Sequence, residues 1–147
     1  MPITFENIIH DRVLTGLEGL IVNEFNIPVY LDEHRGNQSF LLTPSADNLL
    51  DYGQNFQSRD YAIEIEYRFI IGGKFTKNNF KQVSNIAERL KTLIKNNSAY
   101  SDNGDYKWQD GRAESIEYAQ DEEDESVYSV IVVFNCTSME VSWWNIK

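Results

Sequence analysis

The sequence has very few residues of the kinds that most often carry covalent or metal chemistry: one cysteine and two histidines in 147 residues. A single cysteine excludes an intramolecular disulfide, and because Cys136 lies in an apolar strand-like run we interpret it as a small buried hydrophobic residue. His10 and His34 are isolated and lack the spacing of metal ligands. We therefore predict that both histidines are surface residues without a catalytic triad.

Long hydrophobic runs are also missing. No apolar stretch approaches the ~20 residues that span a bilayer, and the N-terminal segment does not have the pattern of a secretory signal. Residues 72–73 and 102–105 match phosphate-binding and calcium-binding loops only in part, because the other required positions are absent. These absences lead us to expect a protein of a reducing cytoplasm that is not an enzyme and has no metal, cofactor or membrane partner.

Basic residues are scarce, with 13 Lys and Arg against 23 Asp and Glu and a net charge of −10. Nucleic-acid readers gain affinity from basic residues, so this balance argues against one. The charges are segregated: residues 76–97 carry a net +4, and residues 110–125 carry a net −7. The two segments are either solvated separately or meet across neighbouring subunits, which makes three lysines candidate interface residues: Lys81, Lys91 and Lys95.

Periodicity predicts two helices and one clear strand. Apolar residues from Phe5 to Ile21 recur at three- and four-residue steps after a possible Thr4 cap, and a second amphipathic pattern covers residues 78–95. Between them, residues 61–71 alternate between apolar and charged side chains, as in a half-buried strand. The second helix is expected to cover the apolar face of that strand.

The remaining segments predict shorter strands and two exposed loops. Residues 27–31 and 39–43 are β-rich, and residues 34–38 have the composition of a turn that joins paired strands. Pro44 is expected to end the second strand, and residues 45–59 are predicted to form a long loop. Residues 106–108 and 113–118 are predicted as strand on either side of a bend or bulge at Asp110 and Gly111.

The last part of the chain supplies the other candidate contact residues. The predicted strand from Tyr128 to Cys136 is apolar on both sides, so its second face is covered either by the first helix or by another chain; Ile131 and Val133 lie on that face. The apolar tail at residues 138–147 contains Trp143 and Trp144, a residue type enriched in binding hot spots. Five consecutive acids form a predicted exposed loop: Asp121, Glu122, Glu123, Asp124 and Glu125.

These elements give the order α-β-β-β-α-β-β in one domain over residues 1–147. The predicted fold is α+β, with one mixed or antiparallel sheet and two main helices packed mainly on one face.

The layout as a whole resembles the tail terminator, or tail completion, proteins of tailed bacteriophages. The resemblance rests on the early amphipathic helix, the Ile27-Pro28-Val29-Tyr30-Leu31 strand, the strand from Tyr61 to Phe69, the helix from Phe80 to Ile94, the segment from Tyr106 to Gly111 and the closing strand from Tyr128 to Cys136.

This resemblance implies a homo-hexameric ring that caps the finished tail tube, ends its polymerisation and joins it to the neck or head. It implies the tail tube protein and neck or head–tail connector proteins as partners, DNA only as a passing polymer, and a place at the head-proximal end of the virion tail after synthesis in the host cytoplasm. Residues 45–59 and 141–144 would contact the tube or neck. The acidic loop at residues 121–125 would face the channel through which DNA passes. Two other classes stay open: an acidic inhibitor or DNA mimic that occupies a basic site on another protein, and a small enzyme.

Overall fold

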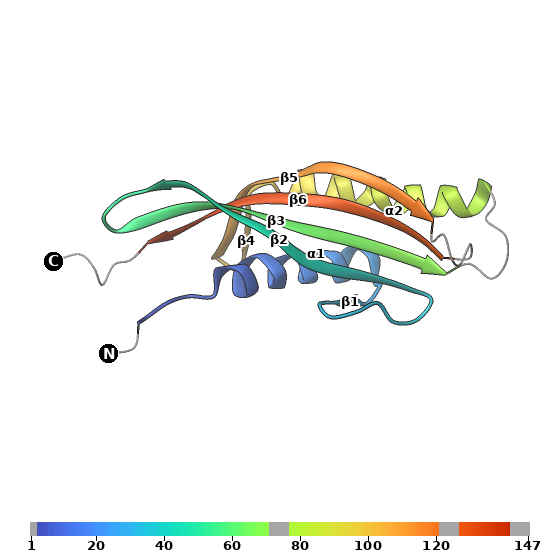
Figure 1. The fold of residues 1–147 in the computed structure, drawn as a ribbon, viewed down its shortest axis with the longest axis horizontal. Coiled ribbons are helices and arrows are strands. Elements are labelled where there is room, and N and C mark those ends of the chain that lie inside the picture. The colour runs from blue at the N-terminus through green and yellow to red at the C-terminus, as the bar shows by residue number, and fades with distance from the viewer. Residues whose placement is uncertain (1–2, 71–76, 121–126, 142–147) are drawn as a thin grey trace.

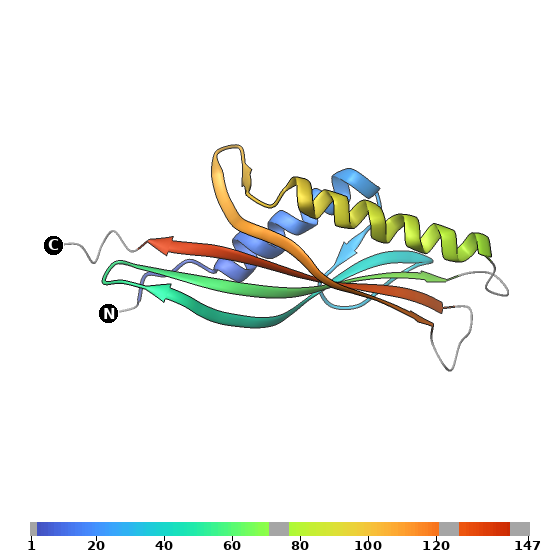
Figure 2. The same cartoon turned by 90° about the horizontal axis from the view of Figure 1, so that it is seen from above.

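The computed structural model describes residues 3–70, 77–120 and 127–141. Within them the chain forms a six-stranded mixed sheet with its helices on one face, which confirms the predicted α+β class. Figure 2 shows both helices on the same side of the sheet, and the sheet curves around them as a half-barrel. The strand order is β1-β2-β3-β6-β5-β4.

The first helix begins later than the sequence suggests. A π-helical segment, η1 (Ile9–Leu14), leads directly into α1 (Thr15–Phe25). Asn7, rather than Thr4, accepts a bond from the His10 amide at 3.3 Å, and Phe5 is 74% exposed instead of belonging to the buried stripe. Asn26 ends the helix in the left-handed conformation (φ 55°), which Asn adopts more readily than most residues.

The strand β1 (Val29–Tyr30) runs parallel to the start of β2 (Gln38–Tyr52). The sequence predicted that a turn at residues 34–38 joins two paired strands. The strands do pair, but the connection carries the chain back to the starting end of β1, so the two strands run in the same direction. Gly36 has a φ of 75° within this connection, a conformation that glycine adopts without steric cost.

The prediction of a long loop at residues 45–59 is wrong. β2 continues through Pro44 to Tyr52, and β3 (Phe56–Ile70) returns beside it, so these residues form the far part of a long β-hairpin. The ladder accommodates Pro44 with an irregularity between Pro44 and Ala46, and a second one follows between Leu49 and Asp51. In Figure 1 this hairpin extends beyond both helices.

The C-terminal half contributes α2 (Lys77–Asn96), β4 (Tyr100–Asp102), β5 (Asp105–Gln120) and β6 (Val127–Val141). The helix boundaries agree with the prediction to within one residue. β4 lies in a segment for which the sequence predicted no strand. The predicted bulge near Asp110 is confirmed by a register shift between Gln109 and Arg112 and by a φ of 57° at Asp110.

One continuous core fills the space between the helices and the sheet. Trp108 is 1% exposed, packs against Tyr100 at a tilt and against Phe134 edge-on with ring centroids 5.0 and 5.2 Å away, and donates its indole N–H to the Asn97 carbonyl at 2.9 Å. Other fully buried side chains come from every layer: Val13, Leu17 and Ile21 from the first helix, Val83 and Leu90 from α2, and Phe40, Leu42, Ile63, Ile65 and Val132 from the sheet.

Candidate functional site

The helix-free face of the sheet was predicted to be covered by the first helix or by another chain. α1 and α2 belong to the same core, on the same side of the sheet, so the first helix does not supply that cover. Ile131 and Val133 lie on the other side and are partly buried by their strand neighbours. Glu66 and Glu117 flank Ile131 in the ladder, so charged side chains surround this apolar pair.

His34 is not a surface residue, which corrects the sequence interpretation. Its side chain is 7% exposed and bridges Ser39 and Glu66: Nδ1 lies 2.7 Å from the Ser39 Oγ and Nε2 lies 2.8 Å from a Glu66 carboxylate oxygen. The bond with His34 is the main cause that lowers the pKa of Glu66. The three residues are 32 positions apart at most, and spacing alone gave no sign that they meet.

The cluster of Ser39, His34 and Glu66 has a structural role. Ser39 is fully buried, so no substrate can reach its hydroxyl. The cluster ties the connection between β1 and β2 to β3, which holds the connection against the end of the helix-free face.

A second polar cluster surrounds Asp60 on β3. Its carboxylate accepts bonds from Arg112 at 3.3 Å and from Asn135 at 3.2 Å, which joins β3 to β5 and β6 beside the bulge. Cys136 is fully buried next to it, and burial raises the pKa of its thiol to about 12. The interpretation of Cys136 as a buried apolar residue is therefore confirmed.

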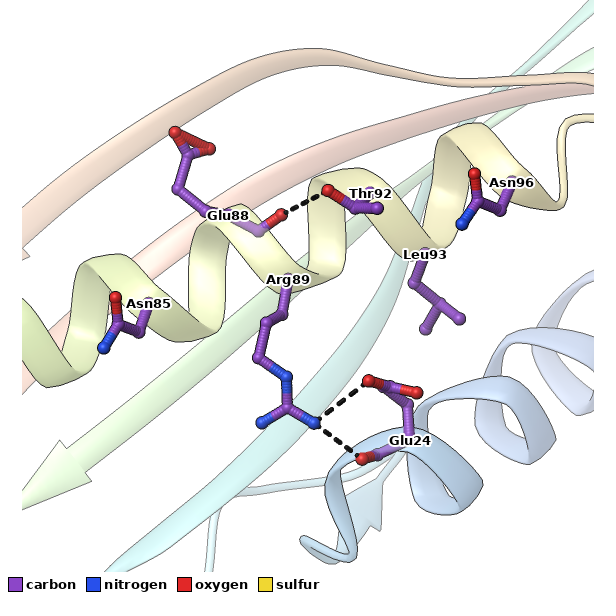
Figure 3. A pocket seen from close by; sticks show the side chains of 7 residues that line it. All are labelled: Glu24, Asn85, Glu88, Arg89, Thr92, Leu93 and Asn96. Carbon is purple, nitrogen blue, oxygen red and sulfur yellow. Dashed lines mark hydrogen bonds and ion pairs between the residues drawn. The ribbon is translucent and has the colours of Figure 1, made fainter.

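A groove of about 550 Å³ lies between α1 and α2, and Figure 3 shows the side chains that line it. Arg89 crosses it and binds Glu24 twice, at 3.0 Å through the carboxylate and at 2.9 Å through the backbone carbonyl. The Arg89 guanidinium also lies 4.6 Å from the centre of the Phe25 ring. These contacts clamp the two helices together, and the other lining side chains supply carboxylate, amide, hydroxyl and aliphatic groups: Glu88, Asn85, Thr92, Leu93 and Asn96.

A second groove, of about 420 Å³, lies between α2 and β5, and we call it the α2–β5 groove. Two of the lysines predicted at an interface, Lys91 and Lys95, line it together with Arg112, and Ile94 and Ala113 supply apolar surface. Its lining thus includes two lysines and no carboxylate residue, and the Arg112 guanidinium is bound by Asp60 and Glu114. The third predicted lysine, Lys81, is exposed elsewhere on α2.

The projecting part of the β2–β3 hairpin, residues 46–58, is named here the hairpin arm. Its outer strand carries large exposed apolar side chains: Leu49 is 47% exposed, Leu50 56% and Tyr52 72%. Phe5 lines a groove with Asp47 and Arg59, which brings residues 3–7 to the base of the arm. The arm was missed by sequence reasoning, although its Leu49-Leu50 pair within a polar segment was a signal of apolar contact surface.

The other predicted site residues lie outside the described part of the chain: Trp143, Trp144, and the acidic run Asp121, Glu122, Glu123, Asp124 and Glu125. Among the described residues, no group of three or more His, Cys, Asp or Glu side chains is placed to hold a metal ion. No helix within the described ranges combines the length and the apolarity needed to cross a membrane.

Comparison with known proteins gives a fold without a family. No family model and no curated protein matches the chain. A solved structure of a protein without a functional name is similar, with a TM-score of 0.52 over 95% of this chain and 97% of that chain, at 13% sequence identity. This similarity shows a shared fold over almost the whole length.

Proposed function

We propose that this protein is a structural virion protein that forms a ring at the head-proximal end of a phage tail tube, ends tube polymerisation and joins the tube to the neck or head. The proposal rests on the resemblance of the sequence layout to tail terminator proteins. The shape of the molecule supports it, because a projecting apolar arm and a separate lined groove are features of a chain that assembles with others.

The observation that carries the proposal is the uneven distribution of exposed apolar side chains. Among the described residues, six of the ten exposed large hydrophobic residues lie on the arm, on residues 3–5 or at Met139, near the end of β6 beside the arm: Ile3, Phe5, Leu49, Leu50, Tyr52 and Met139. Contiguous exposed apolar surface on one end of a protein marks a site of protein contact. A head-to-tail ring needs such a surface on each subunit.

The alternative class, an acidic inhibitor or DNA mimic, needs a contiguous negative surface. On the helix-free sheet face the ladder places Glu64, Glu66 and Glu117 with Arg68 and Arg112, so this face carries a surplus of carboxylates. The oligomeric state separates the two classes, because the assembly proposal requires a ring and an inhibitor or mimic does not.

Electron cryomicroscopy of phage particles that contain this protein tests the proposal. We expect a ring of its copies between the tail tube and the neck. In particles assembled without it, we expect tubes of uncontrolled length and heads that do not join tails. Tails of normal length that join heads in its absence would contradict the proposal.

A further inference from the structure

We propose that the hairpin arm of one subunit docks into the α2–β5 groove of the next subunit, with Leu50 on the apolar floor and Asp51 against the lysine rim. This inference rests on the proposed ring and names the contact that would build it. It starts from the arm, whose exposed apolar residues have no helix above them.

The arm carries two carboxylates, and only one of them is bound by a cationic side chain among the described residues. Asp47 is bound by Arg59 of the same hairpin at 2.5 Å. Asp51 accepts a bond from the backbone amide of Tyr52 at 2.8 Å and has no cationic partner among the described residues. The arm therefore presents one uncompensated carboxylate directly beside Leu50.

The α2–β5 groove has the complementary character. Ile94, which is 4% exposed, and Ala113 provide apolar surface, and Lys91 and Lys95 provide positive charge. Lys91 is bound by Glu88 and Arg112 by Asp60, whereas Lys95 has no acidic partner in the described part of the chain. An incoming Asp51 would thus meet an uncompensated lysine.

The larger groove between α1 and α2 fits the arm less well. Glu24 and Glu88 line it, and its single cation, Arg89, is already bound by Glu24. A carboxylate entering there would meet like charge, which disfavours the contact.

Geometry makes this a contact between copies. The arm extends away from α2 in both Figure 1 and Figure 2, so it does not reach the groove of its own chain. Donor and acceptor surfaces differ, and such head-to-tail contacts close into a ring or extend into a filament. One arm and one groove per subunit suffice for every contact in the assembly.

A charge swap in the full-length protein tests the inference. Asp51→Lys and Lys95→Asp are each expected to weaken self-association about tenfold, measured by sedimentation velocity at increasing concentration. The double variant should recover most of the wild-type association, because opposite charges face each other again. Glu18→Lys, at an exposed position on α1 that lines neither surface, makes the same charge change as Asp51→Lys and should leave association unaltered.

Cross-linking gives a second readout that also applies to rings assembled on tails. Leu50→Cys combined with Lys95→Cys, treated with a short bis-maleimide, should give a ladder of multimers, whereas each single variant should stop at dimers. Native Cys136 is fully buried and will not react in the folded protein.

The outcomes separate this inference from the proposed function. Rings that form normally in Asp51→Lys and Lys95→Asp, or that give no ladder with the paired cysteines, would overturn the docking contact and leave the ring intact. A wild-type protein that neither self-associates nor forms a ring on tails would overturn both. Recovery in the charge swap together with the ladder would establish the contact.

Discussion

The two halves of the β2–β3 hairpin belong to the same strands and the same ladder, yet they have opposite surroundings. In the inner half, Phe40, Leu42, Ile63 and Ile65 are fully buried beneath the helices. In the outer half, from Thr43 to Tyr52, every residue of β2 is exposed. One half of the hairpin therefore contributes to the core of the subunit, and the other half contributes surface.

The outer half keeps its strand form because it continues a sheet that is already fixed. A two-stranded hairpin alone is marginal in water. Here the end of β6 adds a third strand, since Phe56 pairs with Val141 and Asp60 with Thr137. The covered half and β6 thus stabilise the hairpin, so the exposed side chains of the arm are free to contact other molecules. Four predictions can break or sharpen this contrast.

The largest effect is expected at Phe134, which is fully buried and packs edge-on against Trp108. Phe134→Ala should lower the free energy of unfolding by about 3–5 kcal/mol, because it removes apolar contact and leaves a cavity. Urea unfolding followed by circular dichroism measures the loss. Phe134→Leu retains much of the volume and should lose clearly less; equal losses would show that the core is not closely packed there.

The next effect separates two glycines of α1. A Cβ on Gly16 would lie 2.6 Å from the Trp108 ring, whereas a Cβ on Gly19 would meet nothing within 4 Å. Gly16→Ala should therefore destabilise by about 1–3 kcal/mol through overpacking. Gly19→Ala should stabilise by about 0.5–1 kcal/mol through helix propensity. Thermal unfolding of the two variants gives both signs, and a stabilised Gly16→Ala would contradict the packing around Trp108.

A smaller effect is expected at Glu66, whose side chain is 30% exposed and bonded to His34. Glu66→Gln should lower the free energy of unfolding by about 1 kcal/mol at neutral pH, a value kept small by solvent screening. Because folding lowers the pKa of Glu66, its carboxylate stabilises the protein above the ordinary value of 4.5, and this contribution is lost as the pH falls through the lower, folded-state pKa.

Urea unfolding at pH 7 and pH 3 checks this sign. The gap between wild type and Glu66→Gln should shrink at the lower pH. Glu64→Gln changes an exposed carboxylate on the same strand and serves as the control, with no expected gap at either pH. A gap that widens in acid would mean that the bond with His34 does not favour the ionised carboxylate.

The smallest effect on folding is expected in the arm. Leu49→Ser and Tyr52→Ser should each change the free energy of unfolding by less than about 0.5 kcal/mol, because both side chains are already largely exposed in the subunit. Urea unfolding at low protein concentration, where subunits are separate, measures this. A loss above 1 kcal/mol would show that the arm belongs to the core of its own subunit.

The contrast also explains which parts of the fold the sequence could predict. The segment from Tyr61 to Ile70 was predicted as a strand because one of its faces is buried and alternation records that burial. Residues 45–59 lack this alternation, since neither face of β2 is buried there, and Pro44 suggests that the strand ends before them. Their strand form comes from pairing with a neighbour, which composition does not report.

The candidate site likewise has features that the sequence could predict and features that it could not. The lysines of α2 could be found because a helix with one apolar face shows which residues point outward. The groove they line could not be found, because it depends on how α2 packs beside Ala113 on β5. The bridge from His34 to Glu66 likewise depends on two segments that only the register of β2 against β3 brings together.

The order of the strands has a consequence for how the chain reaches this form during synthesis. β6 comes last in the sequence but lies in the interior of the sheet, between β3 and β5. A ribosome that has released only the first hundred or so residues has thus produced a β2–β3 hairpin and an α2 helix without β6, the strand that pairs with β3 and carries the rest of the sheet. Pairing between strands that are far apart in the sequence is slow, and the unpaired edges of these strands stay exposed until it is complete. The subunit can therefore close only after translation of β6, and a truncated chain that lacks β6 has no route to the native sheet.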